Sequence, residues 1–196
     1  MTLRLFALAL VTLSLSGCLF SDAPHSRYFA PLLTLPPAKP QGETLLRFRG
    51  LNAPPYLKDR IVWRVSPEEV GMYDLRRWLS EPAEMVSTEL TRELYQARGL
   101  RRSTAGSAPT LEVDLELFEE ELAPAHLARI QLSALLVNRE QEAMLEKSYR
   151  VERTIPGEEP EDMAQVMGQA LRELVTQVAD DVVAALGGQP AGDPGH

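Results

Sequence analysis

Cysteine and histidine are scarce in this sequence of 196 residues, which contains one cysteine and three histidines. The single cysteine, Cys18, excludes a disulfide bond within the chain. The histidines are His25, His126 and His196, and no two of them have the spacing by which a helix or a hairpin brings metal ligands together. We therefore expect neither a metal centre nor another bound cofactor.

Catalytic motifs are also missing from the sequence. The chain has no G-x-S-x-G nucleophile motif and no glycine-rich phosphate loop. Its 28 acidic residues cannot be sorted into catalytic and structural carboxylates without a fold. The sequence therefore gives no sign of an enzyme, and we expect a non-catalytic protein.

Positive charge is limited, because 20 lysines and arginines stand against 28 acidic residues, for a formal net charge of -8 at pH 7. Nucleic acids and anionic headgroups both require a basic face, so neither is expected as a general partner. The remaining composition, 44% hydrophobic and 24% charged, is that of an ordinary globular domain.

The N-terminus has the features of an exported lipoprotein. Residues 1–17 predict a secretory signal peptide, with an apolar run that is too short to span a membrane. The tetrapeptide LSGC at residues 15–18 resembles a bacterial lipobox, in which the cysteine thiol is first alkylated with diacylglycerol. The chain is then cleaved between Gly17 and Cys18, so that Cys18 becomes the N-terminus and carries acyl chains such as palmitate. Several acyl chains on Cys18 would anchor the protein stably. A plain signal peptide with an accidental cysteine and a buried structural cysteine are the alternatives.

These features predict a lipid-anchored protein of the cell envelope that faces the periplasm. An aspartate directly after the cysteine usually retains a lipoprotein in the inner membrane, so Leu19 favours the outer membrane. Residues 18–42 are expected to form the lipid anchor and a proline-rich tether, because proline favours an extended chain. Residues 188–196 predict a disordered tail, which leaves one domain at residues 43–187.

The first half of this domain predicts three strands followed by a helix. Residues 44–51 and 60–65 are rich in strand-forming side chains, and residues 71–75 return as a short third strand that pairs with the second in a hairpin. Pro82 suits the first position of a helix whose apolar residues recur about every four positions. Gly99 suits its C-terminal end.

The second half predicts the same order of elements. Strands are expected at residues 111–121, 129–138 and 143–155, the first with Leu111, Val113, Leu115 and Leu117 on one side. A helix of about 25 residues with a continuous apolar stripe follows and ends at Gly187. The predicted fold class is α+β, with an antiparallel or mixed sheet of about six strands, two helices on one face, and the order β-β-β-α-β-β-β-α.

Two charged groups belong to these predicted strands. The acidic residues Glu119, Glu120 and Glu121 could bind a cation, but a solvated strand end is the interpretation that we favour. Lys147, Arg150 and Arg153 are expected to lie across from the acidic strand on a solvated face.

Aromatic residues are few, and about half of the tryptophans and tyrosines lie between residues 56 and 78. Core packing is the favoured interpretation, because tryptophan is mostly buried. The alternative is a protein-contact surface, because aromatic and arginine side chains dominate the binding energy of many interfaces. The candidate contact residues are Tyr56, Trp63, Tyr73, Arg77 and Trp78.

The same stretch carries a family resemblance. Residues 27–98 resemble the ABC-type transport auxiliary lipoprotein family, which includes the lipoprotein of the paraquat-inducible system, whereas residues 110–187 agree with it in architecture alone. The matching features are the lipobox, Tyr28, Pro55-Tyr56-Leu57, Ile61-Val62 with Arg64, Tyr73, and Arg77-Trp78.

The resemblance implies a non-catalytic accessory lipoprotein of an ABC or MCE-domain system that moves lipids between two membranes. An MCE-domain or ABC transporter protein is the implied partner, and lipid is a further candidate ligand. The resemblance supplies no catalytic residues. The alternative is a structural or assembly lipoprotein that binds an outer-membrane protein or a cell-wall component, because the sequence of such a protein would look similar.

Overall fold

The structure is a computed structural model that describes residues 25–31 and 37–187. The predicted signal peptide, the lipid-anchor Cys18 and the C-terminal tail lie outside these residues.

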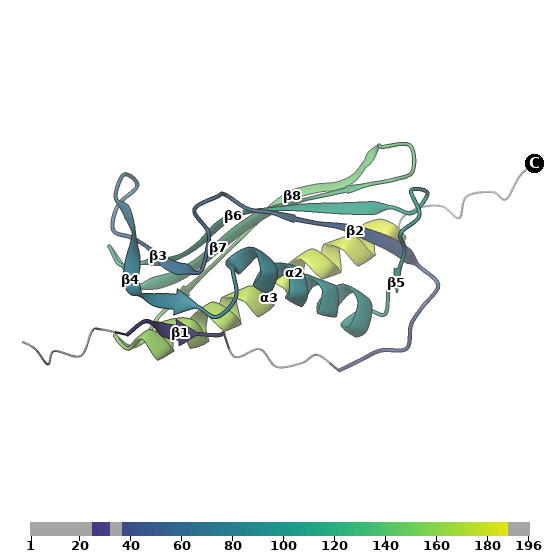
Figure 1. The fold of residues 1–196 in the computed structure, drawn as a ribbon. Helices are drawn as coiled ribbons and strands as arrows, with labels where there is room; N and C mark the ends of the chain where they lie inside the picture. The colour runs from purple at the N-terminus through teal and green to yellow at the C-terminus, as the bar shows by residue number, and fades with distance from the viewer. Residues whose placement is uncertain (1–24, 32–36, 188–196) are drawn as a thin grey trace, which may run out of the picture.

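The described residues form a mixed β-sheet with two helices against one face (Figure 1). The α+β class and the order of the long elements are as predicted, but the sheet has eight strands rather than six, because two strands of two and three residues are too short to show a periodicity. The strands are β1 (Arg27–Phe29), β2 (Leu45–Asn52), β3 (Arg60–Arg64), β4 (Val70–Trp78), β5 (Arg101–Arg102), β6 (Thr110–Glu121), β7 (Leu127–Val137) and β8 (Ala143–Thr154). The helices are α2 (Pro82–Arg92), continued by the π-helical turn η2 (Glu93–Ala97), and α3 (Pro160–Gly187).

Strand β6 is the centre of the sheet. It pairs with antiparallel β7 from end to end, and β7 pairs in turn with β8. Its other edge is shared by two parallel strands: β2 lies beside residues 110–114 and β3 beside residues 119–121. Beyond β3 the sheet continues through antiparallel β4 to β1, and β5 lies beside β2. The predicted hairpin of the second and third strands is therefore confirmed as β3 and β4.

A β-bulge in β6 changes which side chains face the helices. Leu111, Val113 and Leu115 are buried in the core as expected, but the register with β7 shifts between Leu115 and Leu117. An extra residue in one strand reverses the alternation beyond it. Phe118, 1% exposed, therefore takes the next core position, and the prediction that Leu117 faces the core is wrong.

Helix α2 begins and ends where its sequence predicts. Pro82 is its first residue, where the missing N–H costs no helical hydrogen bond. Gly99 ends the helical region with a φ of 71°, and a Cβ atom there would lie 2.6 Å from the carbonyl oxygen of Pro40. Only glycine combines this backbone conformation with such a close passage of the chain. The buried stripe of the helical region consists of Met85, Val86, Leu90, Leu94 and Ala97.

Helix α3 is 28 residues long and lies across β7 and β8. Its predicted apolar stripe is buried at Met163, Val166, Met167, Ala170, Leu171, Leu174, Val178 and Val182. Neither helix within residues 25–31 and 37–187 combines the length and the apolarity that crossing a bilayer demands.

Polar contacts attach α3 to β8. The Asp181 carboxylate lies 2.6 Å from Lys147 Nζ and accepts a hydrogen bond of 2.9 Å from the Tyr149 hydroxyl, and Arg153 pairs with Glu173. The hydrogen bond from Lys147 is the main cause that lowers the pKa of Asp181. Strand β8 pairs with β7 and not with β6, so the expectation that Lys147, Arg150 and Arg153 lie across from the acidic strand is wrong.

Strand β1 extends the sheet upstream of the predicted domain boundary. Its residues pair with β4 in the register Tyr28 to Arg77 and Phe29 to Trp78, and the Phe29 side chain is 7% exposed. The segment predicted as anchor and tether, residues 18–42, therefore contains a strand of the domain. The buried Phe29 ring stabilises this docking by removing apolar surface from water.

We expect Phe29→Ala to lower the free energy of unfolding by about 3 kcal/mol, because the substitution leaves a cavity where a buried aromatic ring packs. Urea unfolding of the domain lacking the signal segment, followed by tryptophan fluorescence, measures the change. Tyr28→Ala is the matched control, since Tyr28 is the neighbouring residue and is 60% exposed. Its expected change is below about 0.5 kcal/mol. Equal effects of the two substitutions would contradict the docking of β1.

Candidate contact site on the β3–β4 hairpin

Tyr56 lies in the loop that joins β2 to β3. Its side chain is partly exposed, and its hydroxyl donates a hydrogen bond of 3.4 Å to the carbonyl oxygen of Glu116. Glu116 belongs to the part of β6 that neither β2 nor β3 covers. Burial, followed by the negative charge of Glu119, raises the pKa of the Tyr56 hydroxyl. Tyr56 thus closes the gap between the two strands that share one edge of β6.

Trp63 lies on β3 directly across from Gly71 on β4. A Cβ atom at Gly71 would lie only 2.2 Å from a carbon of the indole ring, so the ring covers the position where any other residue would carry its side chain. The Trp63 side chain is half-buried. Glycine at residue 71 is therefore what lets the tryptophan lie flat against the hairpin.

Tyr73 lies two residues beyond Gly71 on β4 and is also half-buried. The Arg76 guanidinium lies 4.4 Å from the centre of the Tyr73 ring, within the range of a cation–π interaction. Burial, followed by the negative charge of Glu120, raises the pKa of Tyr73 to about 12. Tyr73 is therefore held between a cation and a carboxylate.

The last two candidate residues have different environments. Arg77 is half-buried, and its Nη1 atom lies 2.6 Å from a carboxylate oxygen of Asp59. Trp78 is 1% exposed, and its ring meets Phe118 edge to face with 5.5 Å between ring centres. Trp78 is therefore a core residue that offers no surface to a partner, as the favoured core interpretation expected for tryptophan.

The candidate residues do not form one continuous surface. Successive side chains of a strand point to opposite faces of a sheet, so Trp63 and Arg64 lie on different faces. Tyr56 lies with Arg64 on the face away from the helices. Trp63, Tyr73 and Arg76 gather on the β3–β4 hairpin, and we call these three residues the hairpin aromatic cluster.

A buried charge cluster lies next to this hairpin on β6. Glu119 is 1% exposed and accepts two hydrogen bonds from Arg64, of 2.8 Å and 3.2 Å. Arg129 on β7 lies 3.6 Å from Glu119 and 2.5 Å from Glu121. These ion pairs join β3, β6 and β7 at one end of the sheet. The favoured interpretation of the acidic residues as a solvated strand end is therefore wrong.

Glu120 points to the opposite face from Glu119 and is 3% exposed. Its Oε1 atom lies 2.6 Å from the Nε2 atom of His126. Its Oε2 atom makes no hydrogen bond within the part of the chain that the structure describes. The two buried carboxylates are thus held by three different cationic or imidazole side chains.

The polar side chains of this region are engaged with one another. Nowhere in residues 25–31 and 37–187 do three or more histidine, cysteine, aspartate or glutamate side chains gather as metal ligands. Glu119 is engaged in ion pairs and Glu120 in a hydrogen bond with His126, while the aromatic rings beside them are partly exposed and held in place by their neighbours. The fold is therefore that of a small α+β domain.

Comparison with known proteins identifies the family. The sequence matches the family described as ABC-type transport auxiliary lipoprotein component over residues 30–179, and the chain belongs to this family. Members are auxiliary lipoproteins of ABC-type transport in the cell envelope, which agrees with the non-catalytic protein expected from the sequence. None of the curated proteins compared with the chain matches it.

Solved structures show the same fold. The protein XCC0632 from Xanthomonas campestris is 20% identical, with 81% of this chain and 96% of that chain covered and a TM-score of 0.73. An uncharacterized protein is 16% identical over 81% of this chain and 99% of its own, with a TM-score of 0.66. The hypothetical protein CT253 from Chlamydia trachomatis is 10% identical over 74% of this chain and 98% of its own, with a TM-score of 0.50.

We expect Glu119→Gln to lower the free energy of unfolding by about 3 kcal/mol, because it leaves the mostly buried Arg64 without its carboxylate partner, while Arg129 keeps Glu121 and Glu152. Denaturant unfolding measures the effect. Glu112→Gln is the matched control on the same strand, since Glu112 also pairs with an arginine, Arg49, but both of these side chains are exposed. Its expected cost is below about 1 kcal/mol. Similar small losses in both variants would show that the buried cluster does not hold the strands together.

We expect Tyr73 to ionise near pH 12, whereas an unperturbed tyrosine ionises near pH 10. Because its pKa is higher in the folded protein, neutral Tyr73 contributes stability below pH 10, and this contribution is lost as the pH rises from 10 to 12. In Glu120→Gln the negative charge disappears while burial remains, so Tyr73 should ionise at a lower pH that is still above 10.

The absorbance of tyrosinate at 295 nm measures this ionisation, and subtracting the titration of Tyr73→Phe isolates Tyr73. Circular dichroism recorded at each pH shows that the domain is still folded. Ionisation of Tyr73 near pH 10, the value of an unperturbed tyrosine, would contradict the description of its surroundings.

Proposed function

We propose that this protein is a non-catalytic accessory component of an ABC or MCE-type system that moves lipid between the two membranes of the envelope. The observation that carries the proposal is the family match over residues 30–179. In this role Cys18 is acylated and holds the domain on the periplasmic side of its membrane, and Leu19 favours the outer membrane. The protein acts by holding the periplasmic part of the transporter in place.

The distance between anchor and domain supports a role at the membrane surface. Nine residues lead from Cys18 to Arg27, the first residue of β1, so the chain between them reaches at most about 32 Å. This is much shorter than the 25-residue tether expected from the sequence. The domain therefore stays near its own membrane, and a partner from the other membrane has to extend to it.

The hairpin aromatic cluster is the surface that we propose for this partner. Trp63, Tyr73 and Arg76 are of the residue types that dominate the binding energy of protein interfaces. Gly71 and the cation–π contact already hold the rings in place, so binding orders few additional side chains. Tyr56 lies on the other face of the sheet, which makes it a natural control.

The proposal is tested by photo-crosslinking in intact cells that make the lipidated protein. A benzophenone amino acid replaces Tyr73 in one variant, Tyr56 in a second, and Val183, an exposed residue of α3, in a third. We expect the Tyr73 variant to crosslink an MCE-domain or ABC transporter protein, identified by mass spectrometry, at least about five times more than the Val183 variant. Crosslinking should fall sharply when Cys18→Ser removes the anchor.

Other outcomes decide between the candidate functions. Capture of an outer-membrane protein or a cell-wall component alone would reject the transport role and support the structural or assembly lipoprotein. Capture of the transporter from Tyr56 but not from Tyr73 would keep the transport role and move the contact to the other face of the sheet. Normal membrane association of Cys18→Ser would reject the anchor.

A further inference from the structure

We propose that one end of the domain, marked by the exposed side chains of Tyr28 and Leu79, lies directly against the bilayer in which the protein is anchored. This inference rests on the proposed lipidation of Cys18. We call Tyr28, Ala30 and Leu79 the anchor-side patch. The patch makes the domain adopt one orientation on the membrane, whereas an anchor alone would let it tumble.

Tyr28 and Leu79 are the most exposed large apolar side chains in the described part of the chain. Tyr28 is 60% exposed and Leu79 is 69% exposed, while the other exposed large apolar residues there range from 36% to 42%. Isolated apolar residues on a surface are ordinary, but two such residues next to each other indicate an interaction surface. The degree of exposure therefore distinguishes this end of the domain.

The pairing of β1 with β4 brings these two residues together. Phe29 pairs with Trp78, and both side chains are buried in the core. The backbone N–H of Leu79 then donates a hydrogen bond of 2.8 Å to the carbonyl oxygen of Phe29, which continues the ladder by one residue. Because side chains alternate along a strand, burial of Phe29 and Trp78 directs Tyr28 and Leu79 outward on the same side.

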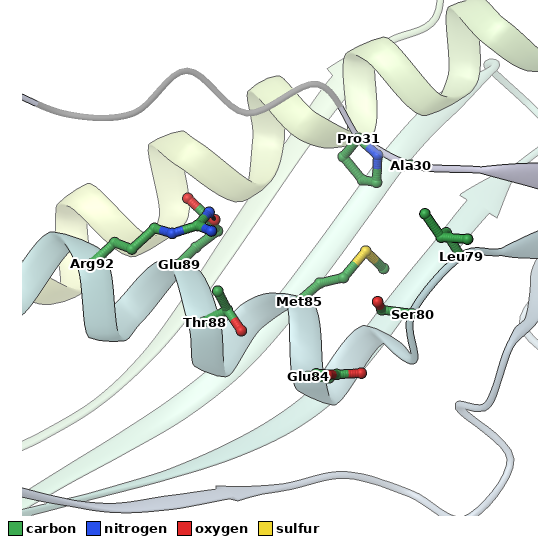
Figure 2. Close-up of a pocket in the computed structure, with 9 residues that line it drawn as sticks. All are labelled: Ala30, Pro31, Leu79, Ser80, Glu84, Met85, Thr88, Glu89 and Arg92. Carbon is green, nitrogen blue, oxygen red and sulfur yellow. Dashed lines mark hydrogen bonds and ion pairs between the residues drawn. The ribbon is translucent and has the colours of Figure 1, made fainter.

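Two hollows adjoin these side chains, one lined by Leu79 and the other by Tyr28. Figure 2 shows Met85 extending from α2, with Leu79, Ala30 and Pro31 around the same hollow, whose volume is about 290 Å³. A second hollow of about 470 Å³ lies on the other side of Ala30, between Tyr28 and the start of α3. Polar and charged side chains complete both linings: Ser80, Glu84, Thr88, Glu89 and Arg92 in the first hollow, and Arg27, Glu161 and Gln165 in the second. The glycerol region of a lipid, which presents both polar and apolar groups, fits such a mixed surface.

The path of the chain indicates that the bilayer is what contacts the anchor-side patch. Tyr28 lies only ten residues after Cys18, so the anchor-side patch is the part of the described domain that the chain from the anchor reaches first. A tyrosine beside aliphatic side chains suits the boundary between headgroups and acyl chains, where tyrosine is enriched. By contrast, Val183 lies near the far end of α3 (Figure 1).

The charges around the patch indicate which lipids matter. Arg27 pairs with Glu161, and Arg77 pairs with Asp59, so both arginines beside Tyr28 already have a carboxylate partner. The patch therefore does not attract anionic headgroups strongly. We expect contact with zwitterionic lipid and little dependence on salt, because burial of apolar surface drives it.

Two side chains are too few to bring a free domain to a membrane. Once Cys18 is anchored, however, the contact becomes intramolecular, and a weak apolar interaction suffices to choose an orientation. The predicted effect is therefore on the position of the patch relative to the bilayer and not on whether the protein is bound.

Spin labels test the orientation in the full lipidated protein. Single cysteines are introduced as Leu79→Cys or Tyr28→Cys and as the control Val183→Cys, and the acylated Cys18 has no free thiol that reacts with the label. Each nitroxide-labelled protein is reconstituted in phosphatidylcholine vesicles, and the collision rates with oxygen and with a water-soluble nickel complex are compared. We expect the ratio of the oxygen rate to the nickel rate to be at least about threefold higher at residues 28 and 79 than at residue 183.

Ratios at residues 28 and 79 equal to the ratio at residue 183 would overturn the proposal. Mass spectrometry of the N-terminal peptide and flotation of the vesicles are done first, and failure of acylation or flotation would reject the anchor itself. Acylated protein that floats with water-exposed labels would reject the patch and leave the proposed function standing. Labels that are immobilised only in native envelopes would show that a protein covers the patch, which also overturns the membrane contact.

Discussion

The backbone pairing of β6 is the constraint on which the rest of the sheet depends. One edge of this strand is occupied from end to end by β7, and the other edge is divided between β2 and β3. Because β2 and β3 run parallel to the same strand, the chain between them has to cross the uncovered part of β6, and Tyr56 closes that gap. The hairpin of β3 and β4, and β1 beyond it, occupy their places because β3 is held there.

The bulge and the buried charges of β6 act together at the same end of the sheet. The extra residue moves Phe118 into the core and places Glu119 on the opposite face. Removing Glu119 from water is costly, and its attraction to Arg64 and Arg129 offsets this cost only when all three side chains keep their geometry. This requirement favours one position of β3 relative to β6 and β7. The hairpin aromatic cluster is therefore carried by strands whose relative position changes little.

Strand β4 connects the two surfaces that the proposals invoke. Its first half carries Gly71 and Tyr73, beside the proposed partner contact, and Leu79 directly follows its last residue, Trp78, at the proposed membrane contact. A domain that rests on the bilayer through one end of β4 would present the other end to the periplasm in a defined direction. In this arrangement the buried Trp78, which touches no partner itself, aligns both surfaces by fixing β4 to the core.

Much of the fold was predictable because its long elements carry their own periodicity. The apolar stripes of α2 and α3, with Pro82 and Gly99 as start and end signals, depend on neighbours within one or two turns and appear directly in the sequence. The strands β2, β3, β6, β7 and β8 were found close to their observed bounds for the same reason. The short β1 and β5 were missed, since a few residues show no repeat and pair only because β4 and β2 lie beside them.

The site was less predictable, because the burial of a side chain depends on which residues from remote parts of the chain pack against it. Trp63 and Trp78 look equivalent in the sequence, yet one lies on the hairpin surface and the other against Phe118. The acidic run of β6 appeared solvated because its cationic partners include Arg64, which lies 55 residues earlier in the chain. The sequence by itself determined the long elements, their order and the family. Only the tertiary structure decided the register after the bulge, the burial of Glu119 and the division of the aromatic residues between core and surface, because each of these depends on contacts between segments that are remote in the chain.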